Sequence, residues 1–166
     1  MTISETANAD LLKLVAFDNE DLEVVSAHLQ DAVVAVSDII WLPAEKRLVV
    51  ALNRFDWIGA LAATPVCRRR RAALRFERVE TFKTRGVDAT AKADVLNLLA
   101  IEFQENAPPG GAVTLNFSGG GALRLEVECV EAELADLGPM WAAVRCPGHP
   151  EDPPEGLPEG EVNSVA

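Results

Sequence analysis

Residues 113–129, VTLNFSGGGALRLEVEC, decide the fold class of this chain. Apolar and polar side chains alternate on both sides of the triple glycine, in residues 113–117 before it and in residues 123–129 after it. An alternation with a period of two is typical of a half-buried β-strand, and a short glycine turn joins two such strands into an antiparallel hairpin. We therefore predict a hairpin with one apolar face toward the core and one charged face toward water.

Further strands are expected upstream of this hairpin, where apolar and β-branched residues cluster between turn residues. Their predicted ranges are 11–17, 33–42, 47–55, 72–82 and 95–103. In the range 72–82 the alternation slips between Phe76 and Val79, which favours a β-bulge there.

Two helices are expected. Asp18 can cap a helix over residues 19–30, whose apolar side chains repeat at three and four residues. A short helix over residues 131–137 is expected to end at Gly138, followed by Pro139. The predicted fold is α+β: an antiparallel meander of six to seven strands, as a curved sheet or open barrel, with one helix after the first strand and a short one after the last. The alternative is a pleckstrin-homology-like barrel.

The length and the net charge of the chain limit the class of protein to which it can belong. The chain has 166 residues and a formal net charge of −11, and no apolar run approaches the length of a membrane helix. The start lacks the pattern of a signal peptide, and the three cysteines are odd in number and widely spaced. We expect a soluble, acidic, cytoplasmic protein with reduced thiols and no membrane contact. Residues 1–9 are expected to be flexible, 10–145 to form one domain, and 146–166 to be a disordered acidic tail rich in proline and glycine.

A basic segment interrupts this acidic chain. Residues 67–93 carry nine basic and three acidic side chains, including four consecutive arginines. Guanidinium groups suit phosphate and carboxylate, so this basic island could bind a small anion or an acidic partner surface. The candidate residues are Arg68, Arg69, Arg70, Arg71, Arg75 and Arg78. The alternative is a solvated surface paired with local acids. Nucleic acid is not expected as a partner, because the net charge repels polyanions and no aromatic residues interleave the arginines.

No catalytic residue, metal site or cofactor is predicted. A strand rather than a helix is expected after Gly119–Gly121, which argues against a phosphate loop. Cys146 and His149 have a metal-ligand spacing, but a structural zinc site needs about four ligands. His28 and His149 are the only histidines, and no nucleophile elbow accompanies them.

Four segments resemble one bacterial family, the domain of unknown function 2948, found chiefly in alphaproteobacteria. They are LNRFDW (residues 52–57), RFERV (75–79), GGGALRLEVEC (119–129) and EAELADLG (131–138). The resemblance covers residues 10–145 and implies a one-domain cytosolic protein of bacteria, without implying an activity, a cofactor or a catalytic residue.

Three functions follow as hypotheses. The first is a non-catalytic protein-interaction or scaffold domain, which binds a protein partner or itself. The second is a binder of a small anionic or phosphorylated ligand through the basic island, from Arg68 to Arg85. An enzyme that uses some of the 26 carboxylates ranks last, so the chain is expected not to be an enzyme.

Overall fold

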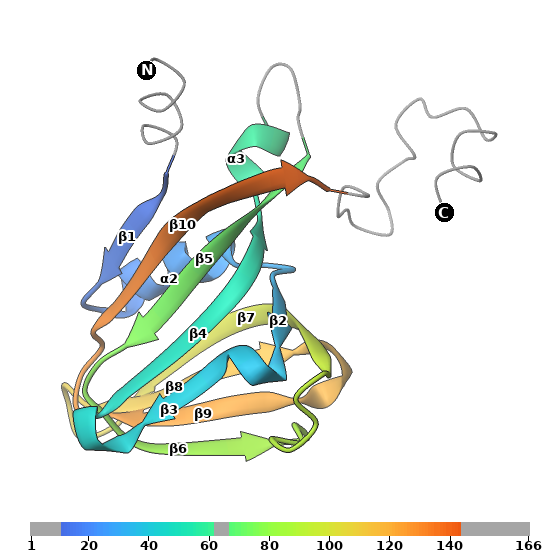
Figure 1. Cartoon of the computed structure of the whole chain (residues 1–166). Helices are drawn as coiled ribbons and strands as arrows, with labels where there is room; N and C mark the ends of the chain where they lie inside the picture. The colour runs from blue at the N-terminus through green and yellow to red at the C-terminus, as the bar shows by residue number, and fades with distance from the viewer. Residues whose placement is uncertain (1–10, 62–66, 144–166) are drawn as a thin grey trace.

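The computed structural model describes residues 11–61 and 67–143, and Figure 1 shows them as one bent antiparallel sheet with two helices. The strands are β1 (Lys13–Ala16), β2 (Val33–Ala35), β3 (Ile39–Leu42), β4 (Arg47–Phe55), β5 (Arg68–Phe76), β6 (Val79–Arg85), β7 (Val95–Glu105), β8 (Gly111–Phe117), β9 (Ala122–Val127) and β10 (Ala132–Ala142). The helices are α2 (Asn19–His28) and α3 (Trp57–Ala60), and the 3-10 turns are η1 (Val36–Asp38), η2 (Pro43–Glu45) and η3 (Ser118–Gly120).

The strands follow the order β1-β10-β5-β4-β2-β7-β8-β9-β6, and β3 pairs with β4 outside this path. The short strand β2 joins two halves: β1, β10, β5, β4 and β3 form one, and β7, β8, β9 and β6 form the other. The α+β class with antiparallel strands is confirmed. The strand count of six to seven is wrong, since the sheet has ten strands. The sheet also stays open, so the pleckstrin-homology-like barrel is not the fold of the described residues.

The hairpin predicted from residues 113–129 is confirmed. It consists of β8, η3 and β9, and Phe117 N donates a hydrogen bond to Gly121 O at 2.8 Å. Gly119 and Gly120 have φ angles of +82° and +91°, a region that favours glycine. The apolar side chains of both strands point inward and join the core between the two halves of the sheet.

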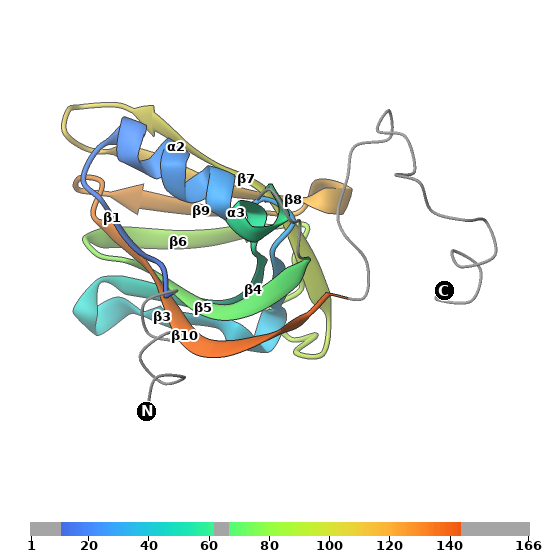
Figure 2. The same cartoon turned by 90° about the horizontal axis from the view of Figure 1, so that it is seen from above.

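Helix α2 begins where the sequence predicts it. Asp18 is the N-cap, and its Oδ1 accepts a hydrogen bond from Asp21 N at 2.8 Å. Leu22, Val25 and Leu29 are buried, so the helix covers the core beside β1 and β7 (Figure 2). The chain just after α2 lies near the end of β4, because Trp57 Nε1 donates a hydrogen bond to Gln30 O at 3.0 Å.

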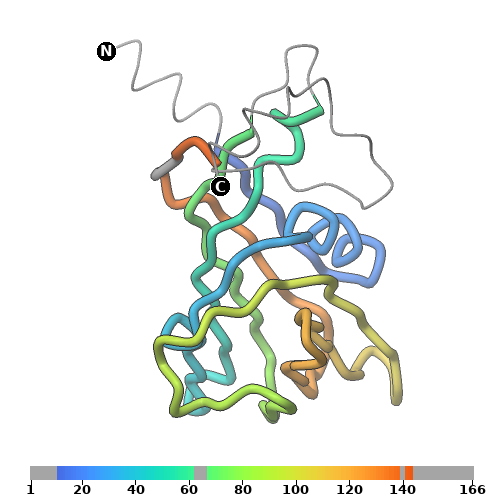
Figure 3. Tube along the Cα trace, turned by 90° about the vertical axis from the view of Figure 1, so that its right-hand side faces the viewer, coloured from blue at the N-terminus to red at the C-terminus, as the bar shows by residue number. Residues whose placement is uncertain are grey.

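The short helix expected over residues 131–137 is wrong, because this segment lies in β10. Glutamate, alanine and leucine are good helix formers, but tertiary packing overrides this propensity. The buried side chains of Ala132, Leu134 and Asp136 alternate with more exposed ones, as in a strand. β10 lies between β1 and β5, and Figure 3 shows the first and last described strands side by side.

Two predicted strands are divided in the structure. Residues 33–42 form β2, the turn η1 and β3. No bulge lies between Phe76 and Val79. Instead the chain passes there from β5, in one half of the sheet, to β6, in the other half. Arg78 makes this turn with a φ of +60°. The run of arginines starts β5, four residues before the predicted strand.

Some predictions lie outside the described residues, among them those for residues 1–9 and 146–166. Within the described ranges, no helix is long and apolar enough to cross a membrane. Cys129 is a free, half-buried cysteine. Cys67 is disulfide-bonded, which corrects the expectation of reduced thiols at this position.

Candidate functional site

The inner face of the sheet becomes polar at one end of β4, β5 and β10. Along these strands the inward side chains are apolar until Arg54, Arg70 and Asp136 take their places. Arg54 lies opposite Arg70 in the β4–β5 ladder, and the pairing of β5 with β10 shifts register just after Asp136. The three residues are only 3%, 4% and 9% exposed. Charged side chains are rarely so buried without partners, so their contacts decide what this end of the sheet can do.

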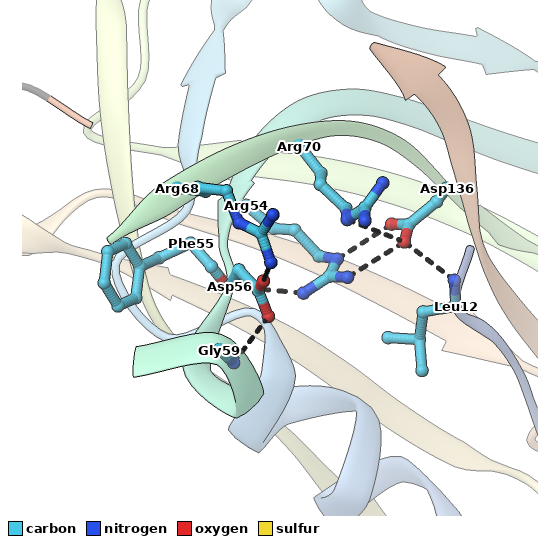
Figure 4. Close-up of polar contacts among 8 residues, drawn as sticks. All are labelled: Leu12, Arg54, Phe55, Asp56, Gly59, Arg68, Arg70 and Asp136. Carbon is cyan, nitrogen blue, oxygen red and sulfur yellow. Dashed lines mark hydrogen bonds and ion pairs between the residues drawn. The ribbon is translucent and has the colours of Figure 1, made fainter. Parts of the chain in front are cut away.

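Asp136 and Arg54 satisfy each other (Figure 4). Arg54 Nε donates to Asp136 Oδ1 at 2.8 Å, and Arg54 Nη2 donates to Oδ2 at 2.9 Å, which makes a two-pronged ion pair. The remaining nitrogen of Arg54, Nη1, donates to Phe55 O at 3.3 Å. Leu12 N donates a further hydrogen bond to Asp136 Oδ2 at 2.8 Å, just before the start of β1. Both oxygens of Asp136 and all three nitrogens of Arg54 are therefore engaged.

Arg70 has no comparable partner. Its Nε lies 3.9 Å from Asp136 Oδ2, too far for a hydrogen bond, and its guanidinium makes no hydrogen bond with any described residue. The oxygens of Asp136 are already engaged by Arg54 and Leu12. Arg70 is therefore a buried cation whose donors are free among the described residues.

Asp56 positions a second arginine at the same end of the sheet. Its Oδ1 accepts a hydrogen bond from Gly59 N at 3.0 Å and so caps the single turn of α3. Its Oδ2 accepts a longer hydrogen bond from Arg68 Nη2 at 3.3 Å. Arg68 Nε is buried and has no hydrogen-bond partner within the described residues. Arg68 thus keeps N–H groups, Nε among them, without an acceptor in the described residues, beside those of Arg70.

These groups line a cavity of about 150 Å³, which we call the arginine pocket. Its lining residues are Leu12, Arg54, Asp56, Ile58, Gly59, Arg68 and Arg70. A water molecule occupies about 30 Å³ in the liquid, so the pocket holds only a few waters or one small ligand. With Asp136 behind the lining, three guanidinium groups and two carboxylates leave a net charge of +1. The pocket can therefore accept one negative charge.

The four consecutive arginines do not share a face, because successive residues of a strand point to opposite sides. Arg68 and Arg70 point into the arginine pocket, whereas Arg69 and Arg71 lie on the outer face. Arg69 Nη1 donates to Asp31 O at 3.1 Å and its guanidinium lies 5.8 Å from the ring centre of Phe55. Arg71 pairs with Asp38 at 3.0 Å.

Arg75 and Arg78 lie at the other end of β5 and are paired with acids. Arg75 Nε is 3.0 Å from Glu77, and its Nη2 is 3.3 Å from Glu133. Arg78 Nε lies 3.5 Å from Glu131. The structure thus brings together two of the six candidate arginines, and binding by any of the six stays a prediction.

Sequence reasoning missed Arg54 and Asp136. A signal for Arg54 was present, because it follows the inward apolar positions of the predicted strand 47–55. Asp136 gave no such signal, because residues 131–137 predict a helix. A charged residue at an inward position needs a partner of opposite charge. Arg54 and Asp136 are such partners for each other. The two residues are 82 positions apart, so the sequence alone does not indicate that they pair.

His28 lies at the end of α2, near enough to Arg54 and Asp136 for their charges to affect its pKa. Burial lowers the pKa of His28 below its ordinary value, and the charge of Arg54 lowers the pKa further. Asp136 and Asp56 act in the opposite direction with smaller effect. Its Nδ1 is buried without a hydrogen-bond partner in the described part of the chain. The neutral imidazole is therefore the favoured form at neutral pH.

The fold and the site define an α+β protein with an open antiparallel sheet and a small buried cationic pocket. The chain belongs to a family described as a protein of unknown function, DUF2948, whose family model matches residues 12–149. The resemblance of the four sequence segments is thereby confirmed. No curated protein and no solved structure matches the chain. In residues 11–61 and 67–143, no group of three or more histidine, cysteine, aspartate or glutamate side chains is placed to hold a metal ion.

Proposed function

We propose that this protein is a non-catalytic binding domain that takes a small anion into the arginine pocket. The observation that carries the proposal is Arg70, which is 4% exposed, lines the cavity and has no hydrogen bond to a described residue. Its one ion pair among the described residues, with Asp136 at 3.9 Å, is long, and a buried charge with so distant a partner is costly. An anion bound to Arg70 would offset this cost by supplying the missing acceptors.

The rest of the charge distribution supports a small ligand over a large one. The chain carries a net charge of −11, so a polyanion is repelled at long range. The outward arginines of the basic island are occupied: Arg71 by Asp38, Arg75 by Glu77 and Glu133. A single small anion that enters a cavity avoids most of this repulsion.

Thermal unfolding of the full chain tests the proposal. Sodium acetate and sodium phosphate are each compared with sodium chloride at equal ionic strength. An anion present at about 100 times its dissociation constant adds about 2.7 kcal/mol to the free energy of unfolding, which raises Tm by several degrees in a domain of this size. We expect at least one of the two anions to raise Tm beyond chloride.

Two variants assign any shift to the pocket. Arg70→Gln is expected to abolish the shift, whereas Arg75→Gln, on the outer face of the same strand, is expected to retain it. No shift with either anion, or an equal shift in the Arg70→Gln variant, would overturn the proposal.

A protein partner is the second candidate function, favoured by a groove of about 540 Å³ away from the arginine pocket. Phe17, which is 67% exposed, and Phe103 line it together with the carboxylates Glu20 and Glu105. Neither glutamate has an ion pair among the described residues. The partner that fits this groove is a basic peptide segment that carries an apolar side chain. A labelled lysine- and phenylalanine-containing peptide should bind, and Phe17→Ser should weaken its binding; no binding by either protein removes this candidate.

We also propose a cytoplasmic location. The odd number and the wide spacing of the cysteines support it, since secreted domains of this size usually carry an even set. The disulfide at Cys67 opposes it, because disulfides are typical of oxidising compartments. Cell fractionation decides between them: recovery of the protein in the cytoplasmic fraction supports the proposal, and recovery outside the cytoplasm overturns it.

A further inference from the structure

We infer that the ligand of the arginine pocket is a small monocarboxylate with a short apolar group, an inference that rests on the proposed function. It follows from three properties of the pocket: its net charge, the geometry of its free donors, and the apolar side chains at its rim.

The net charge of the pocket fits one negative charge. Asp136 neutralises Arg54 through two hydrogen bonds, and Asp56 pairs with Arg68 at 3.3 Å. The uncompensated charge is therefore that of Arg70. A monoanion brings the pocket to neutrality, whereas a dianion would bury a second negative charge without a counterion, which is costly.

The free donors of the pocket fit a planar group with two oxygens. Arg54 uses its Nε and both terminal nitrogens on Asp136 and Phe55 O, so it has no nitrogen left without an acceptor. Arg70 offers an unused guanidinium fork, which matches the geometry of a carboxylate. Arg68 adds Nε as one further donor.

The rim of the pocket fits an apolar substituent. Leu12 borders one side, and α3 borders another through Gly59 and Ile58, whose side chain is 62% exposed. An isoleucine at the mouth of a cationic cavity can cover the apolar part of a ligand whose charged end lies inside. The volume of about 150 Å³ limits that part to a few carbon atoms.

Isothermal titration of the full chain with matched ligands tests this inference. Butyrate and propylphosphonate share a three-carbon tail and differ in the head group, because the phosphonate has a third oxygen and a second ionisable proton. Acetate carries the same head group as butyrate with a shorter tail, and butyramide is a neutral control. We expect butyrate to bind about tenfold or more tightly than propylphosphonate, more tightly than acetate, and butyramide not to bind.

The outcomes separate this inference from the proposed function. Equal or tighter binding of propylphosphonate overturns the carboxylate inference and leaves the anion-binding function standing. Equal binding of acetate and butyrate overturns the apolar group. Binding of neither anion overturns the inference together with the proposed function.

Two variants test the roles of the residues. Arg70→Lys keeps the charge but loses the fork, so we expect butyrate binding to fall about tenfold or more, while Arg75→Lys on the outer face leaves it unchanged. Ile58→Ser lies on an exposed turn and so should not perturb folding; it should remove the preference for butyrate over acetate without weakening acetate binding. An unchanged preference in the Ile58→Ser protein contradicts the assignment of Ile58, whether or not the Arg70 variant folds.

Discussion

Arg54 and Arg70 are direct cross-strand partners in the β4–β5 ladder, and one carboxylate, that of Asp136, serves both. Like charges directly opposite each other destabilise a sheet, and burial strengthens the effect. Asp136 gives its two hydrogen-bonding oxygens to Arg54 and leaves Arg70 with a contact of 3.9 Å. The ligand-free protein thus holds one buried guanidinium at a cost in stability, which gives the arginine pocket a measurable signature.

Replacing Arg70 by methionine should stabilise the ligand-free protein. The change Arg70→Met removes a buried charge without taking a hydrogen bond from Asp136, so we expect the free energy of unfolding to rise by about 1–3 kcal/mol. Urea unfolding in a chloride buffer without carboxylates measures it. A fall in stability would mean that Arg70 is well compensated in the folded protein.

Replacing Asp136 by asparagine should strongly destabilise the protein. The change Asp136→Asn leaves Arg54 and Arg70 buried without a carboxylate, and we expect a loss of about 3–5 kcal/mol in urea unfolding. Glu133→Gln is the matched control on the outer face of the same strand, where the effect should stay within about 0.5 kcal/mol. Similar losses in the two variants would argue against a special role of the buried pair.

Removing the cap of α2 should have a smaller, local effect. Asp18→Ala takes away the acceptor of Asp21 N, and we expect a loss of about 1 kcal/mol in unfolding free energy. Asp18→Asn keeps an acceptor oxygen at the same place and should be close to neutral. A cost as large for asparagine as for alanine would assign the effect to charge.

The pH dependence of stability should include a contribution from His28. Its pKa in the folded protein lies below the ordinary value of 6.5, so the unfolded chain binds the proton more readily. The contribution of His28 is therefore fully present above pH 6.5 and is lost as the pH falls below that value. We expect His28→Gln to lose less stability than the unmodified protein between pH 7.5 and pH 5. Parallel curves for the two proteins would show that His28 does not contribute.

The sequence predicted local features better than distant ones. The β8–β9 hairpin and the cap of α2 depend on neighbouring residues, and both are confirmed. For residues 131–137 the sequence predicts a helix, because the glutamates, alanines and leucines favour one when the neighbouring strands are unknown. The strand becomes evident only once Asp136 is seen as an inward residue paired with Arg54.

The arginine pocket could be predicted only in part. The run from Arg68 to Arg71 indicates an anion site, but the strand sends alternate side chains to opposite faces. The pocket also needs Arg54 and Asp56, from the end of β4, and Leu12, from the segment before β1. A single sequence contains no information about which of these segments become neighbours.

The position of β10 also affects the order in which the molecule can be assembled. β10 follows the other described strands in the chain, yet it lies inside the sheet, between β1 and β5. A nascent chain without residues 132–142 has no partner for the facing edges of these two strands, and it lacks the carboxylate that Arg54 requires. The cationic end of the sheet can therefore form only after residues 132–142 have been synthesised, and chains truncated before β10 should be recognised by chaperones as unfinished.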